Sequence, residues 1–258
     1  MKDRPPVPAW FSYFVSPFLW VAAIFISILY SLSGIIFVFP LTFFFDPIKR
    51  SAMHQVARGW GKALLAVNPF WKLEVSGESH IDPRSRYVIA ANHQSLLDIL
   101  VVLAALKVNF KFIAKQELFA VPFVGWHMAL TGYVALERGN AESGRKTLES
   151  SRRYLKNGVS VLYFPEGTRS PDGRIHEFKT GAFKLAQDEN VEVLPVVIDG
   201  TGDAIPKKSW RLAKHSCFHV SIGKPVRISG RDSLAAVEAA KKIRQEMTQQ
   251  LDNLRRSG

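Results

Sequence analysis

The sequence predicts an α/β domain whose mixed, largely buried sheet is flanked by helices, with an apolar helical membrane anchor before it. From residue 71 onward, short runs rich in β-branched and aromatic residues alternate with stretches of helical periodicity. Such alternation is typical of a sheet covered by helices. Before this region, residues 10–45 contain no Asp, Glu, Lys, Arg or His, which indicates a membrane-seeking segment.

The apolar segment has two alternative structures. A straight helix of its 36 residues would be about 54 Å long, well beyond the roughly 30 Å hydrocarbon core of a bilayer. Residues 18–39, bracketed by prolines, would make a single span of about 33 Å. Alternatively, Ser31, Ser33 and Gly34 turn the chain into a re-entrant helical hairpin. Basic residues on both flanks favour the hairpin, because both ends would then lie on one side.

We divide the chain into an anchor, residues 1–45, and one domain, residues 46–258, which shows neither an internal repeat nor a low-complexity linker. The flank that follows the anchor is the more basic of the two, with four Lys or Arg residues between positions 49 and 62. The domain is therefore expected on the cytoplasmic face of a membrane. A cleaved signal peptide does not fit, because the apolar run is too long and ends in Phe43-Phe44-Phe45-Asp46.

The elements of the domain are expected in the following order. A helix over residues 47–66 ends at an Asn-Pro boundary. Strands are predicted at residues 71–75, 87–91, 110–114, 133–136, 159–164, 191–198 and 218–222. Helices are predicted at residues 95–106, 143–155 and 181–187, and an amphipathic surface helix at residues 233–256.

The composition excludes several other classes of protein. With 258 residues and 47% hydrophobic residues, the chain supports one sizeable core and is too apolar for a disordered protein. A single cysteine, Cys217, excludes an intramolecular disulfide and any site of several thiolates. The net charge of +12 suits an anionic membrane surface. Nucleic-acid binding is not expected, since no nucleic-acid motif accompanies this charge.

The first loop rich in polar and ionisable side chains follows the strand at residues 87–91. Ser95 and Asp98 have capping-box spacing, so the Asp98 carboxylate is expected to reach back from the first helical turn toward His93. A carboxylate that takes the proton of one imidazole nitrogen leaves the other free to act as a base. No enzyme nucleophile accompanies this pair, so catalysis would need a substrate hydroxyl that His93 deprotonates. The alternative is that Asp98 only caps and His93 is an ordinary loop residue.

The second such loop follows the strand at residues 159–164. Here Pro165 and Gly167 stop the strand, Thr168 adds a hydroxyl, and Arg169 presents a planar fork suited to phosphate. The alternative is a charged turn in which Glu166 pairs with Arg169.

Two further cations stand at the ends of other predicted strands. Lys115 follows the strand at residues 110–114, and Arg138 follows the strand at residues 133–136. Together with Arg169 they would form a seat for a phosphomonoester, which carries a charge of about −1.5 to −2. The alternative is solvated surface charge.

These blocks resemble those of the glycerolipid acyltransferases, and most closely the lysophosphatidic acid acyltransferases. They occur in the family's order over about 107 residues. The first has the family's His-four residues-Asp spacing (HX4D). The blocks are Asn92-His93-Gln94-Ser95-Leu96-Leu97-Asp98, Gly132-Tyr133-Val134-Ala135-Leu136-Glu137-Arg138, Phe164-Pro165-Glu166-Gly167-Thr168-Arg169-Ser170 and Leu194-Pro195-Val196-Val197-Ile198.

The resemblance implies roles for individual residues. His93 would be the catalytic base and Asp98 would orient it. Binding of the acceptor phosphate and integrity of the site are implied for the second and third blocks, at Arg138, Glu166, Gly167, Thr168 and Arg169, with Lys115 as a further phosphate contact. No metal and no cofactor is implied: acyl-coenzyme A or acyl carrier protein would serve as co-substrate, and the seven scattered His show no zinc-ligand spacing.

The implied activity is transfer of a fatty acyl group to the sn-2 hydroxyl of lysophosphatidic acid, giving phosphatidic acid in phospholipid biosynthesis. Membrane lipid is then the expected partner. The short chain with one anchor resembles bacterial members, which suggests the bacterial inner membrane. Three alternatives stay open at this point: an acyltransferase for glycerol phosphate, another lysophospholipid or a lyso-ornithine lipid; a non-catalytic membrane lipid-binding protein; and a lipid hydrolase.

Overall fold

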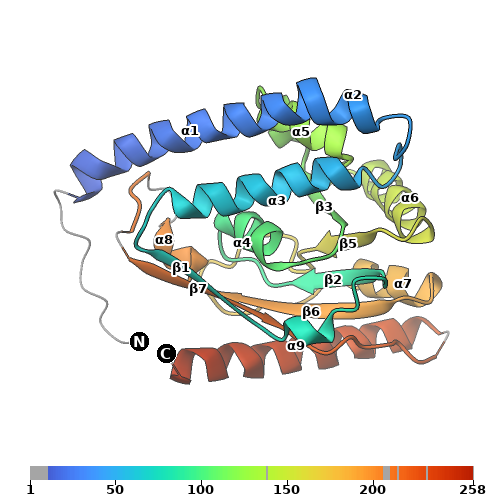
Figure 1. Cartoon of the computed structure of the whole chain (residues 1–258). Helices are drawn as coiled ribbons and strands as arrows, with labels where there is room; N and C mark the ends of the chain where they lie inside the picture. Colours follow the sequence, from blue (N-terminus) through green and yellow to red (C-terminus); the bar gives the residue numbers. More distant parts are fainter. Residues whose placement is uncertain (1–10, 138, 206–209, 214, 231, 258) are drawn as a thin grey trace.

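A seven-stranded sheet forms the centre of the protein in a computed structural model (Figure 1). The structure describes residues 11–137, 139–205, 210–213, 215–230 and 232–257. The strand order is β1-β7-β6-β2-β5-β3-β4. The strands are β1 Trp71–Ser76, β2 Tyr87–Ala91, β3 Phe110–Lys115, β4 Val134–Leu136, β5 Ser160–Tyr163, β6 Glu192–Asp199 and β7 Ser216–Ile222.

The sheet is mixed, as the sequence predicts. Five neighbouring strands, β6, β2, β5, β3 and β4, are parallel, whereas β7 is antiparallel to β6 and parallel to β1. The register places Ala90 of β2 beside Tyr163 of β5 and Pro195 of β6. Because parallel strands end at one edge of a sheet, the loops after β2, β5 and β6 leave from the same edge.

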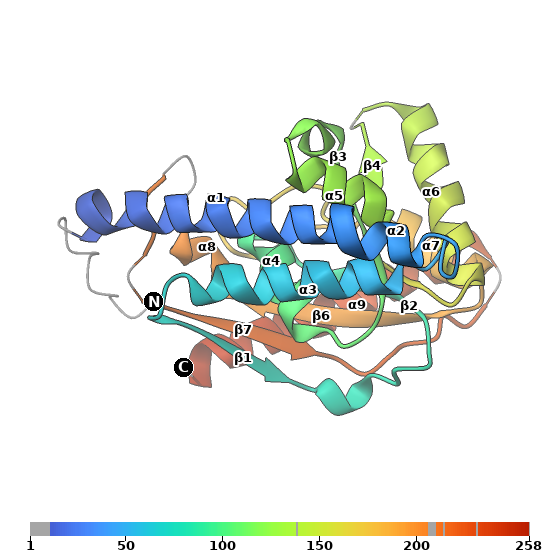
Figure 2. The same cartoon turned by 45° about the horizontal axis from the view of Figure 1, so that its top comes forward.

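Helices cover both faces of the sheet (Figures 1 and 2). One face packs against α3 Ser51–Ala66, α4 Leu97–Ala105 and α5 Val124–Thr131. The other face packs against α6 Ala141–Lys156, α7 Gly181–Asp188 and α9 Ser233–Ser257. The buried side chains of α9 recur every three or four residues, at Ala236, Ala240, Ile243, Met247 and Leu251. This spacing confirms the amphipathic C-terminal helix. Short helices complete the fold: η3 Glu78–His80, η4 Gln116–Ala120 and α8 Thr201–Ala204.

The predicted elements are present, with ends that differ by at most four residues. The largest difference is at α3, which begins at Ser51 rather than at residue 47. Arg50 adopts a left-handed conformation there, with φ 47°, and the Asp46 carboxylate accepts the Ser51 N–H at 2.7 Å. Helix α5 was not predicted, because its eight residues carry no clear helical alternation of polar and apolar side chains.

The apolar segment forms one continuous helix and no hairpin. Its parts are η1 Phe11–Val15, α1 Ser16–Ser33, η2 Gly34–Val38 and α2 Phe39–Thr42, and Tyr13–Thr42 is long and apolar enough to cross a membrane. Gly34 keeps right-handed helical angles. An added Cβ there would lie 2.7 Å from Nδ1 of His127. The turn predicted at residues 31–34 is therefore wrong, since the glycine permits close packing and does not reverse the chain.

This N-terminal helix lies along α3 on the outer side of the domain (Figures 1 and 2). Near its start, Nε1 of Trp20 donates to the carbonyl oxygen of Trp210 at 2.7 Å. In its middle, Nε1 of Trp60 on α3 donates to Oγ of Ser27 at 3.0 Å. Hydrogen bonds therefore join the helix to the domain in its first half and at its middle.

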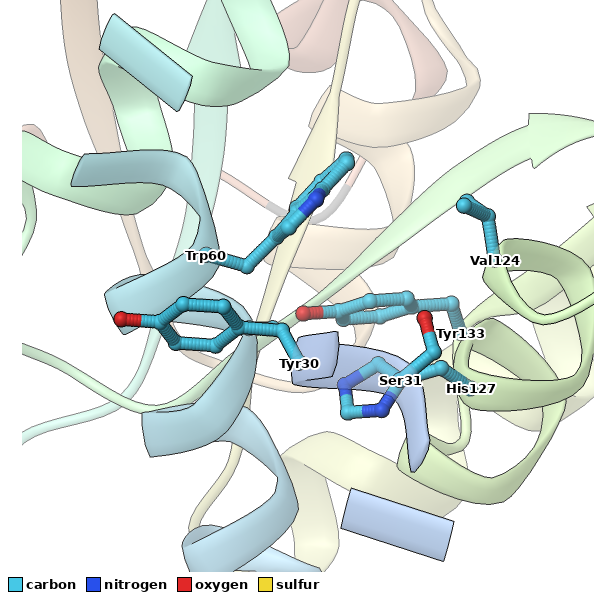
Figure 3. A pocket seen from close by; sticks show the side chains of 7 residues that line it. Tyr30, Ser31, Trp60, Val124, His127 and Tyr133 are labelled. Carbon is cyan, nitrogen blue, oxygen red and sulfur yellow. The ribbon is translucent and has the colours of Figure 1, made fainter. Parts of the chain in front are cut away.

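The contact surface between this helix and the domain is closely packed. Figure 3 shows a cavity in it, about 20 Å³ in volume, which is room for about one water molecule. Side chains from the N-terminal helix, α3, α5 and the start of β4 surround it: Tyr30, Ser31, Ala57, Trp60, Val124, His127 and Tyr133.

Candidate active site

His93 and Asp98 form a hydrogen-bonded pair directly after β2. Nδ1 of His93 lies 2.7 Å from Oδ2 of Asp98. The Asp98 side chain is fully buried, whereas the His93 side chain keeps 13% of its surface exposed. A carboxylate at Nδ1 holds the proton of the neutral ring on that nitrogen and leaves Nε2 as an acceptor. The structure thus brings together the two residues that the HX4D spacing selects.

Three further donors converge on Asp98. Oδ2 also accepts the backbone N–H groups of Gln94, at 2.6 Å, and Ser95, at 2.9 Å. Oδ1 accepts the hydroxyl of Thr201 at 2.5 Å. These bonds compensate for the loss of water around a buried carboxylate. Thr201 was missed by the sequence analysis, because it lies 103 residues away and belongs to none of the four blocks.

The predicted capping box is only half correct. Asp98 does reach back to the backbone before α4, but the helix begins at Leu97 and its N-cap is Leu96. The Ser95 hydroxyl accepts the Leu97 N–H at only 3.4 Å. The carboxylate of Asp98 thus accepts the Ser95 N–H as in a capping box, whereas the Asp98 N–H donates to the backbone carbonyl of Ser95 and not to its hydroxyl.

Three contacts from the loop after β5 hold His93. The ring of Phe164 stacks on the imidazole, with centroids 4.1 Å apart and planes at 20°. The backbone N–H of Ser170 donates to the His93 carbonyl at 2.7 Å. In turn, the backbone N–H of His93 donates to Oε1 of Glu166 at 2.9 Å. The first and third blocks thus form one hydrogen-bonded unit.

Glu166 is a buried connector between backbone segments. Its Oε2 accepts the backbone N–H of His176 at 3.0 Å, in addition to the bond from His93. Burial raises the pKa of the Glu166 carboxyl, and the two N–H donors partly oppose this shift by stabilising its charge. The alternative pairing of Glu166 with Arg169 does not occur: Arg169 is exposed and makes no ion pair within the part of the chain that the structure describes.

The other side chains predicted to bind phosphate have different surroundings. Thr168 is exposed on the same turn as Arg169. Lys115 lies at the end of β3, where its Nζ pairs with Glu117 at 2.7 Å. Arg138 lies outside the described residues. The structure therefore places Thr168 and Arg169 on one exposed turn and Lys115 on a neighbouring strand end.

Lys179 is a further cation at this turn, and the sequence motifs do not single it out. Its backbone N–H donates to the carbonyl of Pro165 at 2.8 Å. Gly167 has φ +72°, in the left-handed region, and an added Cβ there would lie 2.9 Å from Nζ of Lys179. The missing side chain at Gly167 therefore leaves room for the ammonium of Lys179 beside the turn that carries Arg169.

The loop after β2 is also tied to β6. Nδ2 of Asn92 donates to the Ile198 carbonyl at 2.9 Å, and the Ile198 N–H donates to Oδ1 of Asn92 at 2.7 Å. Nε2 of Gln94 donates to the same carbonyl at 3.1 Å. Asn92 and Gln94, which belong to the first block, thus bind the strand that the fourth block forms.

One group of potential metal ligands occurs among the residues the structure describes. Donor atoms of Glu74, Cys217 and His219 lie within 4.8 Å of one another on β1 and β7. In the strand order, β6 separates these strands from β2 and its loop with His93. None of the block residues belongs to this group, and the metal-independent reaction stays a prediction.

Comparison with known proteins agrees with the resemblance. A family model described as Acyltransferase matches residues 72–199. The 1-acyl-sn-glycerol-3-phosphate acyltransferase LPAT1, chloroplastic, of Arabidopsis thaliana is 39% identical over 211 residues, 81% of this chain and 58% of that protein. The 1-acyl-sn-glycerol-3-phosphate acyltransferase of Saccharomyces cerevisiae is 33% identical over 185 residues, 70% of this chain and 60% of that protein. The chain thus spans about three fifths of the length of these curated relatives.

A solved structure extends the similarity to nearly the whole chain. The crystal structure of the 1-acyl-sn-glycerophosphate (LPA) acyltransferase PlsC from Thermotoga maritima superposes with a TM-score of 0.71 at 30% sequence identity. The superposition covers 92% of this chain and 98% of that one. The similarity therefore reaches beyond the segment that the family model matches.

Proposed function

This chain belongs to the acyltransferase family, and we propose that it transfers a fatty acyl group from a thioester to the sn-2 hydroxyl of lysophosphatidic acid, giving phosphatidic acid. The observation that carries the proposal is the hydrogen-bonded pair of His93 and Asp98. This pair is bonded directly to the loop that presents Arg169. A base and a cation for the acceptor phosphate thus belong to one edge of the sheet.

His93 acts as the general base in this mechanism. Its Nε2 takes the proton of the acceptor hydroxyl, and the hydroxyl oxygen attacks the carbonyl carbon of the thioester. The new C–O ester bond forms as the C–S bond breaks, and the protonated His93 gives its proton to the leaving thiolate. The imidazolium that exists between these steps is stabilised by the carboxylate of Asp98.

Arg169 and Lys179 hold the acceptor phosphate. The phosphomonoester carries a charge of about −1.5 to −2, which two cations nearly balance. A guanidinium can bind two phosphate oxygens at once, and the exposed hydroxyl of Thr168 adds a donor on the same turn. Glu166 positions His93 through the backbone, since its two carboxylate oxygens accept the N–H groups of His93 and His176. Lys115 and Arg138 stay predicted phosphate contacts.

The donor is acyl-coenzyme A or acyl carrier protein. Both supply a thioester, and the mechanism involves only its carbonyl carbon and its sulfur. Every proton in the scheme passes through His93, and no step of the scheme uses a metal ion or a bound cofactor.

We also propose that the helix Tyr13–Thr42 lies in the plane of a membrane surface. The domain holds it from Ser16, whose Oγ accepts the Leu212 N–H at 3.2 Å, to Gly34 beside His127. A transmembrane orientation would pull the charged side chains of α3 into hydrocarbon, which is costly. The basic residues that follow the helix favour the cytoplasmic face.

The outward side of this helix fits that orientation. Large apolar side chains recur there every three or four residues and are half or more exposed: Phe14, Phe18, Val21, Phe25 and Leu29. Three apolar side chains on η4, on α5 and between them are also exposed: Leu118, Val121 and Trp126. An apolar face of this kind on an otherwise polar domain is typical of a helix embedded in the membrane interface.

Transfer of a labelled acyl group tests the proposed reaction. The full chain in detergent receives acyl-coenzyme A or acyl carrier protein as donor. The acceptors are lysophosphatidic acid, glycerol phosphate, other lysophospholipids and lyso-ornithine lipid. Phosphatidic acid from the wild type but not from folded His93→Ala is the expected result.

Each other outcome points to one alternative. Transfer to a different acceptor would replace lysophosphatidic acid as the substrate. Free fatty acid released without any acceptor would indicate a hydrolase. No transfer from either donor would favour a lipid-binding protein.

A further inference from the structure

The C-terminal helix α9 contacts the catalytic edge of the sheet through Arg255. This residue lies one turn beyond the buried Leu251, and its side chain keeps 37% of its surface exposed. Its Nε and Nη2 donate to Oδ1 of Asp199 at 3.2 and 2.8 Å. Nη2 also donates to the carbonyl oxygen of Gly173 at 2.9 Å. A single guanidinium thus joins the end of β6 to the loop that follows β5.

The geometry of this bridge is specific at both ends. Asp199 keeps only 12% of its side chain exposed, and the guanidinium is its ion-pair partner. Gly173 has φ +73°, and an added Cβ would lie 3.3 Å from Nη2 of Arg255. The absence of a side chain at Gly173 therefore allows the guanidinium to reach the backbone.

Each segment that Arg255 holds also carries a hydrogen bond to the catalytic pair. Thr201, two residues after Asp199, donates to Oδ1 of Asp98. Ser170, three residues before Gly173, donates from its backbone to the His93 carbonyl. Arg255 itself touches neither His93 nor Asp98, so its effect on them has to pass through these two segments.

We propose that Arg255 is a positioning residue for the acyl transfer, an inference that rests on the proposed function. Without the guanidinium, the largely buried Asp199 carboxylate loses its ion-pair partner, which is costly. One donor that remains is Nε2 of Gln94, which lies 3.5 Å from Oδ1 of Asp199 and also donates to the Ile198 carbonyl. Movement of Gln94 toward Asp199 pulls on the loop whose backbone N–H groups hold Oδ2 of Asp98.

Arg255→Met tests this role against Arg256→Met, which removes the same charge from an adjacent exposed residue. Both variants are compared with the wild type below their melting temperatures. In Arg255→Met we expect kcat to fall about tenfold or more, because small displacements of catalytic groups are costly. The KM values for acceptor and donor should stay within about twofold, since no binding group is removed. A folded Arg255→Met with wild-type kcat would overturn the proposal.

A double-mutant cycle with Asp199→Asn asks whether Arg255 acts through Asp199. We expect Arg255→Met to lower kcat much less when the partner charge is already gone. If the two substitutions lowered kcat independently, so that their fold-changes multiplied in the double mutant, Arg255 would not act through Asp199. If Arg255→Met does not fold, Arg255→Lys replaces it in both measurements. Lysine keeps one charged contact but cannot bind Asp199 and Gly173 at the same time, so an intermediate kcat is expected. Full activity of Arg255→Lys would contradict the proposal that the guanidinium joins the two segments.

Hydrogen exchange provides a readout that needs no substrate. The backbone N–H groups of Gln94 and Ser95, which donate to Asp98, should exchange faster in Arg255→Met than in Arg256→Met or the wild type. Unchanged exchange would overturn the proposal for Arg255. If the wild-type protein transferred no acyl group, only the proposed function would be contradicted. Hydrogen exchange at Gln94 and Ser95 would still decide whether Arg255 positions this loop.

Discussion

The hydroxyl of Thr201 donates a 2.5 Å hydrogen bond to Oδ1 of Asp98, the carboxylate oxygen that His93 does not use. Oδ2, on the other side, receives His93 and two backbone N–H groups. Any rotation of the carboxylate therefore breaks a bond on at least one side. The orientation of the base is thus determined from the end of β6 as well as from its own loop.

Thr201→Val should lower kcat by about tenfold while the protein stays folded. Valine keeps the shape of threonine but leaves Oδ1 of Asp98 buried without a donor, which costs about 1–3 kcal/mol. Thr201→Ser, which restores the hydroxyl, should recover most of the rate. Steady-state kinetics of the two variants check this. Equal rates for valine and serine would show that the hydrogen bond does not matter.

Asp98→Asn should reduce kcat by about 10³–10⁴-fold. The amide cannot stabilise the imidazolium, and its single oxygen cannot accept the donors on both sides of the group as the carboxylate does. Single-turnover rates measure the loss, and circular dichroism confirms folding of the variant. A folded variant with more than a tenth of the wild-type rate would contradict the role of Asp98.

Arg169→Ala and Lys179→Ala should each raise KM for lysophosphatidic acid by about tenfold or more, with KM for the thioester donor nearly unchanged. The loss of a cation weakens binding of the phosphate and leaves the acyl donor unaffected. Lys184→Ala is the matched control, since Lys184 is an exposed lysine on α7. A monoacylglycerol acceptor, which lacks phosphate, should show no difference between variants. Equal changes in both KM values would contradict the phosphate site.

Stability should rise with pH between about 7.5 and 9.5 because of Lys111. Burial lowers the pKa of this lysine to about 7, whereas the unfolded chain keeps the proton up to its ordinary pKa of 10.5. The unfolded state binds more protons in this interval, so raising the pH favours the folded state. The free energy of unfolding should increase on the order of 2–3 kcal/mol in the wild type and less in Lys111→Met. Urea titrations at several pH values measure this change. The same dependence of the free energy of unfolding on pH in both proteins would refute the assignment to Lys111.

Much of the fold follows from local sequence signals. Strand β2 occupies the predicted residues 87–91, because its run of β-branched and aromatic side chains is sharply bounded. The prediction of a hairpin at Gly34 was wrong because of a tertiary contact. The glycine packs against His127, which lies on a helix far away in the sequence. The strand order was likewise not predictable, since β1 and β7 pair over a long stretch of intervening chain.

The candidate site was predictable where its residues are close in sequence. His93 and Asp98 share one loop, and their contact follows from spacing and helix geometry. Thr201 and Lys179 were missed because only the folded sheet brings them to the other blocks. The capping role of Ser95 was misjudged because α4 begins two residues later than predicted, with Leu96 at its N-cap, so the Ser95 hydroxyl does not accept the Asp98 N–H.

The pairing of β1 with β7 has a consequence for synthesis of the protein. The hydroxyls of Ser76 and Ser221, which meet across these strands at 2.9 Å, are 145 residues apart. At about 5–20 residues per second, the ribosome needs about 7–30 s to make the intervening chain. During that time β1 is an unpaired sheet edge on the nascent chain, exposed to association with other polypeptides. A chaperone that covers this edge until β7 emerges would therefore raise the yield of folded protein.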